Sequence, residues 1–147
     1  MPTLILLRHA KSDWNAPVSD AERPLNDRGR RQAAEAGDWL RVHQPGIDAA
    51  VVSTARRAQE TFECAALDVP AVSSDAAYTF DPTELLQIVR KRTEDSVLVV
   101  SHEPALAELV HLLTGESVEM KTSAIAVLEL RSWVSGGTLV AHGRPPS

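Results

Sequence analysis

The sequence predicts an α/β fold, a three-layer sandwich in which helices cover both faces of a mainly parallel central sheet. Short apolar runs without polar alternation recur along the chain, and such runs are typical of strands buried on both faces. Segments with helix start and stop signals separate these runs, and strands that alternate with helices favour a parallel sheet. The chain has 147 residues, which suits one domain, and we expect a single domain over residues 1–147.

The first half of the chain is expected to hold two strands and two helices. Residues 3–7 form a nearly continuous apolar run, which predicts the first strand. Residues 8–26 are polar and contain two prolines, so we expect a loop there. Asn26 is a good N-cap for the helix that follows it. Residues 49–52 predict the second strand, and a helix is expected over residues 55–67.

A short third strand and a capped helix follow. Residues 71–73 are expected to form the strand. Asp81 can cap the next helix, Pro82 suits its first position, and Glu84 can complete a capping box. These two carboxylates therefore have a structural role available to them.

The last part of the chain predicts one more strand and helix and then a closing pair of strands. Residues 97–100 are a strongly apolar strand, and residues 104–113 are expected to be helical. Residues 124–130 and 138–142 are expected to be strands, and Gly136-Gly137 between them indicates a hairpin.

Composition excludes several classes of function. The net charge is -5 and no long basic cluster is present, so we expect no nucleic-acid partner. No apolar run is long enough to span a membrane, and no signal peptide is evident, so a cytoplasmic location is expected. Cys64 is the only cysteine, which excludes an internal disulfide and a cysteine-based metal cluster.

Basic side chains follow three of the predicted strands. Arg8 and His9 follow the first, Arg57 lies just after the second, and His102 follows the strand over residues 97–100. Because the carboxyl ends of parallel strands meet at one edge of a sheet, these side chains are expected to form one cationic pocket. Arginine suits phosphate oxygens, and a neutral imidazole can attack phosphorus. The pattern predicts phosphoryl transfer.

We expect this chemistry to need no metal and no cofactor. The chain lacks a carboxylate-rich loop for a catalytic metal and a GxxxxGK[ST] loop for a nucleoside triphosphate. Arginines can stabilise the transferred group without Mg²⁺. The same arginines are expected to lower the pKa of His9 and keep it neutral near pH 7.

Three blocks of the sequence resemble those of the histidine phosphatase superfamily, which includes phosphoglycerate mutase-like enzymes. The first block is LRHAKSDWN at residues 7–15, where the family has Arg-His-Gly followed by Ser, Trp and Asn. The second is STARRAQET at residues 53–61, and the third is VVSHEP at residues 99–104. The chain departs from the family pattern at Ala10, which replaces Gly, and at Thr54, which replaces Pro.

More narrowly, the segments Arg23-Pro24-Leu25 and Arg28-Gly29 look like the compact SixA-like branch, which is associated with removing phosphoryl groups from protein phosphohistidine. The resemblance implies a phosphoglycerate mutase-like fold and one histidine phosphatase domain over residues 1–147. It also implies a phosphorylated protein or a small phosphomonoester as the substrate.

The resemblance implies a role for each matching residue. His9 would be the nucleophile and would form a phosphohistidine, Arg8 and Arg57 would hold phosphoryl oxygens, and His102 would hydrogen-bond to the phosphoryl group. A second set of substrate-binding candidates is expected at the rim: Asn15, Ser12 and Arg23.

The acid that protonates the leaving group is not fixed by the sequence. Larger relatives take it from between the second and third blocks, where Asp81 and Glu84 are candidates here. A phosphohistidine substrate would lessen the need for an acid, since its leaving imidazole is less basic than an alkoxide. Trp14 could line the mouth of the pocket or cover an edge of the core, and we expect the second. His43, His111 and His142 are expected to be structural.

Two alternatives remain open at this point: a phosphoglycerate mutase-type phosphotransferase and a noncatalytic phosphate-binding module. Only about 40 residues separate Thr61 from His102, too few for the inserted segment of the mutases. We therefore expect an open, shallow site, which suits a phosphate displayed on a protein.

Overall fold

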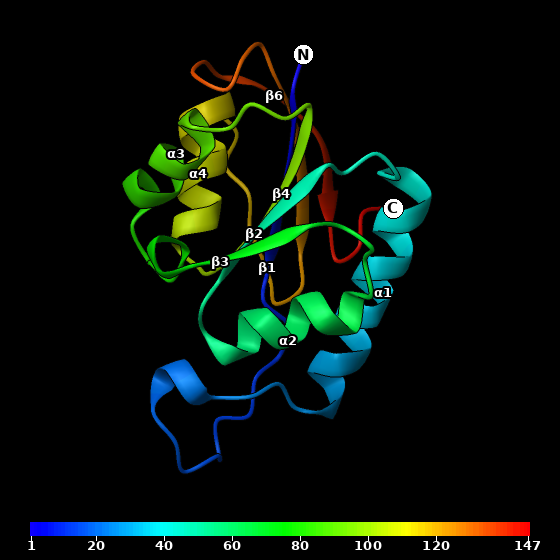
Figure 1. The fold of residues 1–147 in the computed structure, drawn as a ribbon, viewed down its shortest axis with the longest axis vertical. Coiled ribbons are helices and arrows are strands. Elements are labelled where there is room, and N and C mark those ends of the chain that lie inside the picture. The colour runs from blue at the N-terminus through cyan, green and yellow to red at the C-terminus, as the bar shows by residue number, and fades with distance from the viewer.

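A computed structural model describes residues 1–147 and shows a six-stranded sheet flanked by helices (Figure 1). The strands are β1 (Thr3–Arg8), β2 (Ala49–Ser53), β3 (Ala71–Ser74), β4 (Ser96–Ser101), β5 (Ile125–Leu130) and β6 (Gly137–Gly143). The helices are α1 (Asp27–His43), α2 (Arg56–Ala65), α3 (Pro82–Arg90) and α4 (Ala105–Thr114), with short 3₁₀ turns η1 (Asp20–Glu22) and η2 (Asp75–Ala77).

The sheet is mixed and mostly parallel, in the order β3-β2-β4-β1-β5-β6. The pairs β2–β3, β2–β4 and β1–β4 are parallel, whereas β5 pairs antiparallel with both β1 and β6. The predicted strands are all present, and Gly137 begins β6 rather than sitting in the turn. The expected hairpin of β5 and β6 is confirmed, with β5 beside β1 in the interior of the sheet.

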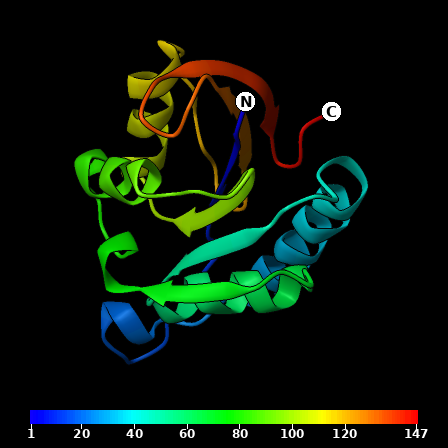
Figure 2. The same ribbon diagram turned by 45° about the horizontal axis from the view of Figure 1, so that its top comes forward.

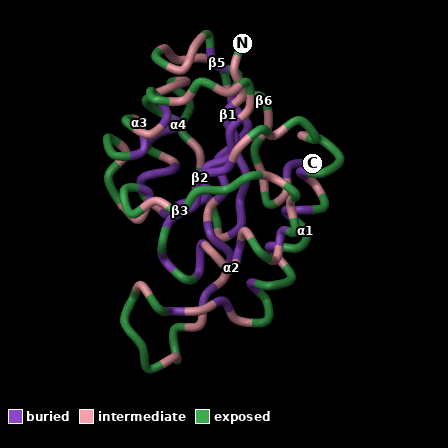
Figure 3. The backbone as a smooth tube through the Cα atoms, viewed as in Figure 1, coloured by how far each residue is buried: buried purple, intermediate pink, exposed green.

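Two apolar layers hold the helices against opposite faces of the sheet. Leu4 and Leu6 of β1 point into the layer under α3 and α4, and Ile5 and Leu7 point into the layer under α1 and α2. This alternation follows from the two-residue period of a strand. Figure 2 shows the two helix pairs on either side of the sheet, and Figure 3 shows burial concentrated in the central strands. The three-layer α/β prediction is confirmed.

The helix caps agree with the sequence in part. The Asn26 side chain accepts a hydrogen bond from the amide of Gly29 and caps α1, as predicted. Asp81 caps α3 by accepting from the amide of Thr83. The predicted capping box does not form as expected, because the amide of Asp81 donates to Thr79 Oγ1 instead of to Glu84.

The segment between β1 and α1 is more ordered than the loop that the sequence predicts. It contains η1 and an isolated antiparallel bridge between Ser12 and Leu25. It forms the part of the ribbon that extends beyond α2 in Figure 1. The first turn of α1 packs against its start, since a Cβ on Gly29 would overlap the carbonyl of Lys11. A glycine at this position therefore sets the path of the chain just after His9.

None of the helices is both long and apolar enough to cross a bilayer.

Candidate active site

A cavity of about 280 Å³ lies where the carboxyl ends of the parallel strands meet, as the sequence predicts for the site. Its lining combines strand ends, the segment after β1 and the segment before α3. The lining residues are Arg8, His9, Lys11, Ser12, Trp14, Asp20, Arg23, Arg57, Phe80, His102, Glu103 and Thr122. The fold thus gathers all four predicted catalytic residues, together with two of the three rim candidates.

His9 is held in one tautomer by the backbone. Its Nδ1 lies 2.8 Å from the carbonyl oxygen of Ala10, which can only accept, so Nδ1 carries the proton and donates. The other nitrogen, Nε2, therefore keeps its lone pair. The main chain is fixed on both sides, since the His9 amide donates to Ser101 and the His9 carbonyl accepts from Ser123. The geometry presents a nitrogen that can act as a nucleophile.

His102 lies beside it, with the two imidazole centroids 5.2 Å apart. Its Nδ1 is 3.4 Å from Nη2 of Arg57, which can only donate. Nε2 therefore carries the proton and donates to Ser53 Oγ at 2.7 Å. Residues from three strand ends, β1, β2 and β4, thus converge on one pair of histidines.

Both histidines are neutral at pH 7. Burial lowers the pKa of His9 from 6.5 to about 3, and the charges of His102, Arg57 and Arg8 act in the same direction. Burial likewise lowers the pKa of His102 to about 4, with Arg57 as the next contribution. The sequence predicted the direction for His9 correctly. The arginines contribute in the predicted direction, but desolvation of the buried ring is the larger cause.

Arg57 is fully buried, and Asp20 holds its guanidinium. Nη1 donates to the backbone carbonyl of Asp20 at 2.7 Å, and Nη2 donates to its carboxylate at 3.1 Å. Thr61, one turn along α2, donates to the Arg57 carbonyl and accepts from the amide of Ala10. The helix that carries Arg57 is therefore tied directly to the residue after His9.

Asp20 joins three side chains in one network. Its carboxylate accepts hydrogen bonds from Arg23 at 3.0 Å, from Arg57, and from the hydroxyl of Tyr78. The hydrogen bond from Tyr78, followed by the two arginines, holds the pKa of Asp20 well below its ordinary value. This carboxylate stays ionised at neutral pH, so it is unsuited to donate a proton.

Arg8 and Glu103 both line the cavity, and their opposite charges attract. Arg8 Nη1 donates to the carbonyl of Met120 at 3.1 Å. Glu103 accepts from the amide of Ala107 in α4 at 2.8 Å, and burial raises the pKa of this carboxyl. The Nε–H groups of both Arg8 and Arg57 are buried without a hydrogen-bond partner.

Trp14 belongs to the rim of the cavity rather than to the core. Trp14 was expected to cover the core, but it is exposed and stands at the cavity. Its ring covers the Arg23 guanidinium, with Cζ 3.6 Å from the ring centroid. Arg23 also donates to Ser12 Oγ. The Trp14 indole therefore packs on the Arg23 guanidinium instead of on the apolar core.

Three further sequence candidates do not line the cavity. Asn15 lies in the exposed segment after β1, and its backbone amide donates to the carboxylate of Asp13. Asp81 and Glu84 lie at the start of α3, where Asp81 serves as the cap. The cavity instead contains Asp20, Phe80 and Glu103, which sequence reasoning missed. Only Glu103, adjacent to His102, had a sequence signal that could have found it.

No group of three or more His, Cys, Asp or Glu side chains is arranged to hold a metal ion.

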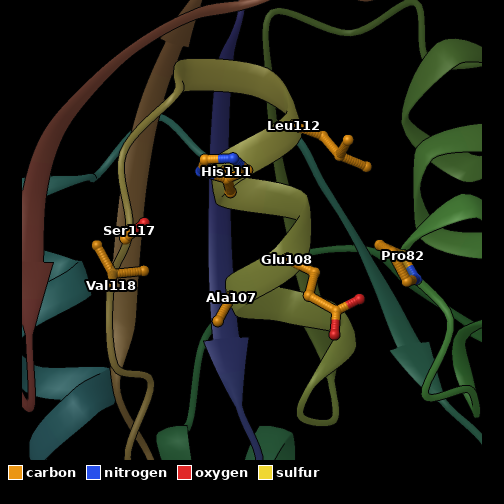
Figure 4. A pocket seen from close by; sticks show the side chains of 7 residues that line it. All are labelled: Pro82, Ala107, Glu108, His111, Leu112, Ser117 and Val118. Carbon is orange, nitrogen blue, oxygen red and sulfur yellow. The ribbon is translucent and has the colours of Figure 1, made fainter.

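A second, larger groove of about 480 Å³ lies along α4 near the start of α3 (Figure 4). Its lining residues are Pro82, Ala107, Glu108, His111, Leu112, Ser117 and Val118. His111 is the only basic side chain there, and no arginine or lysine lines the groove. It therefore lacks the charges that a phosphate site needs.

Comparison with known proteins agrees with the geometry. Residues 4–76 match the family model for the histidine phosphatase superfamily (branch 1). The uncharacterized protein Rv1276c of Mycobacterium tuberculosis is 36% identical over 84% of this chain and 87% of its own length. Phosphohistidine phosphatase SixA of Escherichia coli is 31% identical over 86% of this chain and 84% of its own length.

Solved structures extend the likeness to the fold. The protein histidine phosphatase SixA, solved in complex with tungstate, superposes with a TM-score of 0.87 at 29% identity, over 95% of each chain. A 2,3-bisphosphoglycerate-dependent phosphoglycerate mutase from Staphylococcus carnosus is 41% identical, but over only 28% of its length. The phosphoglycerate mutase-like fold expected from the sequence is therefore confirmed. The chain belongs to the histidine phosphatase superfamily, branch 1, and is SixA-like.

Proposed function

We propose that this protein is a metal-independent phosphatase that passes a phosphoryl group through His9, and that its substrate is phosphohistidine displayed on a protein. In this proposal residues 1–147 form one histidine phosphatase domain. The observation that carries it is the tautomer of His9. The proton is held on Nδ1 by the Ala10 carbonyl, which leaves Nε2 as a neutral nucleophile in an arginine-lined cavity.

The reaction proceeds in two balanced steps. Nε2 of His9 forms a bond to phosphorus while the bond from phosphorus to the leaving nitrogen breaks. His9 then carries the phosphoryl group on Nε2 and a proton on Nδ1. Water next attacks phosphorus, the bond to Nε2 breaks, and the two protons of water leave with dihydrogen phosphate. His9 returns to its starting tautomer without exchanging its Nδ1 proton.

Arg8, Arg57 and His102 stabilise the transferred group. Arg8 and Arg57 each hold a buried, unpartnered Nε–H near the cavity, and a phosphoryl oxygen is a suitable acceptor for such a donor. His102 lies beside His9, and its Nε2–H, which donates to Ser53 Oγ in this structure, is the group that would donate to a phosphoryl oxygen. Ser12 and Arg23 belong to the same lining and would bind substrate at the rim.

A phosphohistidine substrate suits the carboxylates of the cavity. Its ring can leave as neutral imidazole when the second nitrogen is already protonated, so no strong acid is needed. Asp20 is ionised and accepts hydrogen bonds from two arginines and a tyrosine, so it has no proton to donate. The similarity to the E. coli phosphohistidine phosphatase supports the same substrate class. A small phosphomonoester remains the second candidate, because Glu103 lines the cavity and burial raises its pKa, which is the direction that a proton donor needs.

The test is phosphate release from a phosphohistidine-bearing protein in EDTA, with wild type and His9→Gln compared. We expect release by wild type and none by the variant. Product analysis with 3-phosphoglycerate distinguishes a phosphatase from a mutase, because a mutase would return an isomer rather than phosphate. A noncatalytic phosphate-binding module would bind phosphate and release none from any substrate.

A further inference from the structure

Two exposed aromatic side chains stand at the mouth of the catalytic cavity. The chain has only six aromatic residues of the Phe, Trp and Tyr types. Among its exposed large hydrophobic side chains only Trp14 and Phe80 are aromatic, with 72% and 56% of their surface exposed. Both line the same cavity. Exposure of large apolar side chains gathered at one place is typical of a binding surface.

The two rings come from different parts of the chain and are each held by a residue of the site. Trp14 lies in the segment after β1, and the Arg23 guanidinium covers one of its faces at 3.6 Å. Phe80 lies just before α3 and meets His102 edge to face, with centroids 6.0 Å apart and an interplanar angle of 67°. His102 in turn lies 5.2 Å from His9. Only the His102 side chain therefore separates the Phe80 ring from His9.

We infer that Trp14 and Phe80 form an aromatic rim that contacts the ring bearing the phosphoryl group, and so select phosphorylated imidazole over ring-free phosphoryl compounds. The inference rests on the proposed function, since it needs a phosphoryl group that enters the cavity toward His9. An aromatic pair in offset or edge-to-face contact contributes enough to change selectivity about fivefold per ring. The contact acts on the leaving group, whereas the arginines act on the phosphoryl group, whichever compound carries it.

The experiment compares two small substrates that share a phosphorus–nitrogen bond, and a phosphohistidine-bearing protein is assayed beside them. Free phosphohistidine carries the imidazole ring, and phosphoramidate does not. We expect Trp14→Ala and Phe80→Ala each to lower the ratio of kcat/KM for phosphohistidine to kcat/KM for phosphoramidate about fivefold. Trp14→Phe keeps a ring and is expected to keep most of the ratio. Val134→Ala removes an equally exposed apolar side chain far along the sequence and outside the cavity lining, and serves as the control.

Each outcome is decisive. Hydrolysis of both substrates by every variant with an unchanged ratio would overturn the aromatic rim and leave the proposed phosphatase intact. A loss seen only with a protein-borne phosphohistidine, and not with the free amino acid, would also overturn it. That result would mean that the two rings contact the protein surface around the phosphorylated residue. Failure of wild type to hydrolyse free phosphohistidine, while it still releases phosphate from a phosphohistidine-bearing protein, would overturn the rim and leave the proposed function intact. Failure with the phosphorylated protein as well would remove both.

Discussion

The two cavity histidines are expected to destabilise the protein in mild acid. Burial lowers the pKa of His9 to about 3 and that of His102 to about 4, whereas each histidine titrates near 6.5 in the unfolded chain. Below pH 6.5 the two histidines therefore bind protons in the unfolded chain but stay neutral in the folded protein. The free energy of unfolding falls as the pH drops below 6.5, and the effect levels off only near pH 4 for His102 and pH 3 for His9.

The size of the effect follows from these values. At about pH 5, protonation of an unfolded histidine lowers the free energy of the unfolded chain by about 2 kcal/mol, so the pair accounts for about 4 kcal/mol relative to neutral pH. Solvent screening reduces this little, because His9 is 7% and His102 1% exposed. The raised pKa of Glu103 works in the opposite direction. The depressed pKa of Asp20 matters only at lower pH, where an unfolded aspartate takes up its proton.

The assay is guanidinium denaturation at about pH 7.5 and about pH 5. We expect the loss of unfolding free energy for wild type to be about 4 kcal/mol, and His9→Gln to show only about half of that loss. His142→Gln, which changes an exposed histidine outside the cavity, should behave as wild type. An equal loss in wild type and His9→Gln would refute the reasoning, because it would mean that His9 titrates normally in the folded protein.

The remaining predictions concern the Asp20 network, a close backbone contact and inhibition. Asp20→Asn is expected to lower kcat/KM for phosphohistidine about tenfold, since Arg57 loses a charge-assisted hydrogen bond that is partly exposed to solvent; unchanged turnover would show that Arg57 is held without it. Gly29→Ala is expected to lower the unfolding free energy by about 2 kcal/mol, because its Cβ would overlap Lys11, and thermal melts beside Gly46→Ala, where space is open, check this. Tungstate, a tetrahedral oxyanion, is expected to inhibit phosphate release in EDTA competitively, and noncompetitive inhibition would place it outside the cavity.

Most of the fold could be predicted from the sequence because its signals are local. Apolar runs, the Asn26 cap and the helix start at Asp81 each depend on neighbours in the chain. The convergence of His9, Arg57 and His102 followed from one topological rule, that parallel strands end at a common edge. The strand order of the sheet, in which the antiparallel β5 lies beside β1, could not be predicted in the same way. No local signal contains that pairing, because the two strands are more than a hundred residues apart.

The parts of the site that the sequence missed depend on long-range contacts. Asp20 reaches Arg57 across 37 residues, and no spacing rule connects them. Trp14 is exposed because Arg23 from the same segment offers it a stacking partner, which a count of apolar residues does not reveal. The main cause of the lowered pKa of His9 also required the structure, since burial is a property of the packed fold rather than of the residues nearby in sequence.

The central claim is that the phosphoryl group passes through His9, and trapping the intermediate tests it most directly. Wild type would be mixed with excess phosphohistidine-bearing protein in EDTA, quenched in base, and digested for peptide mass spectrometry, with His9→Gln treated alongside. We expect an acid-labile phosphoryl group on the peptide that contains His9 of wild type, and no phosphoryl group on the variant. Release of phosphate by wild type with the phosphoryl group found on another residue, or continued turnover by His9→Gln, would contradict the account.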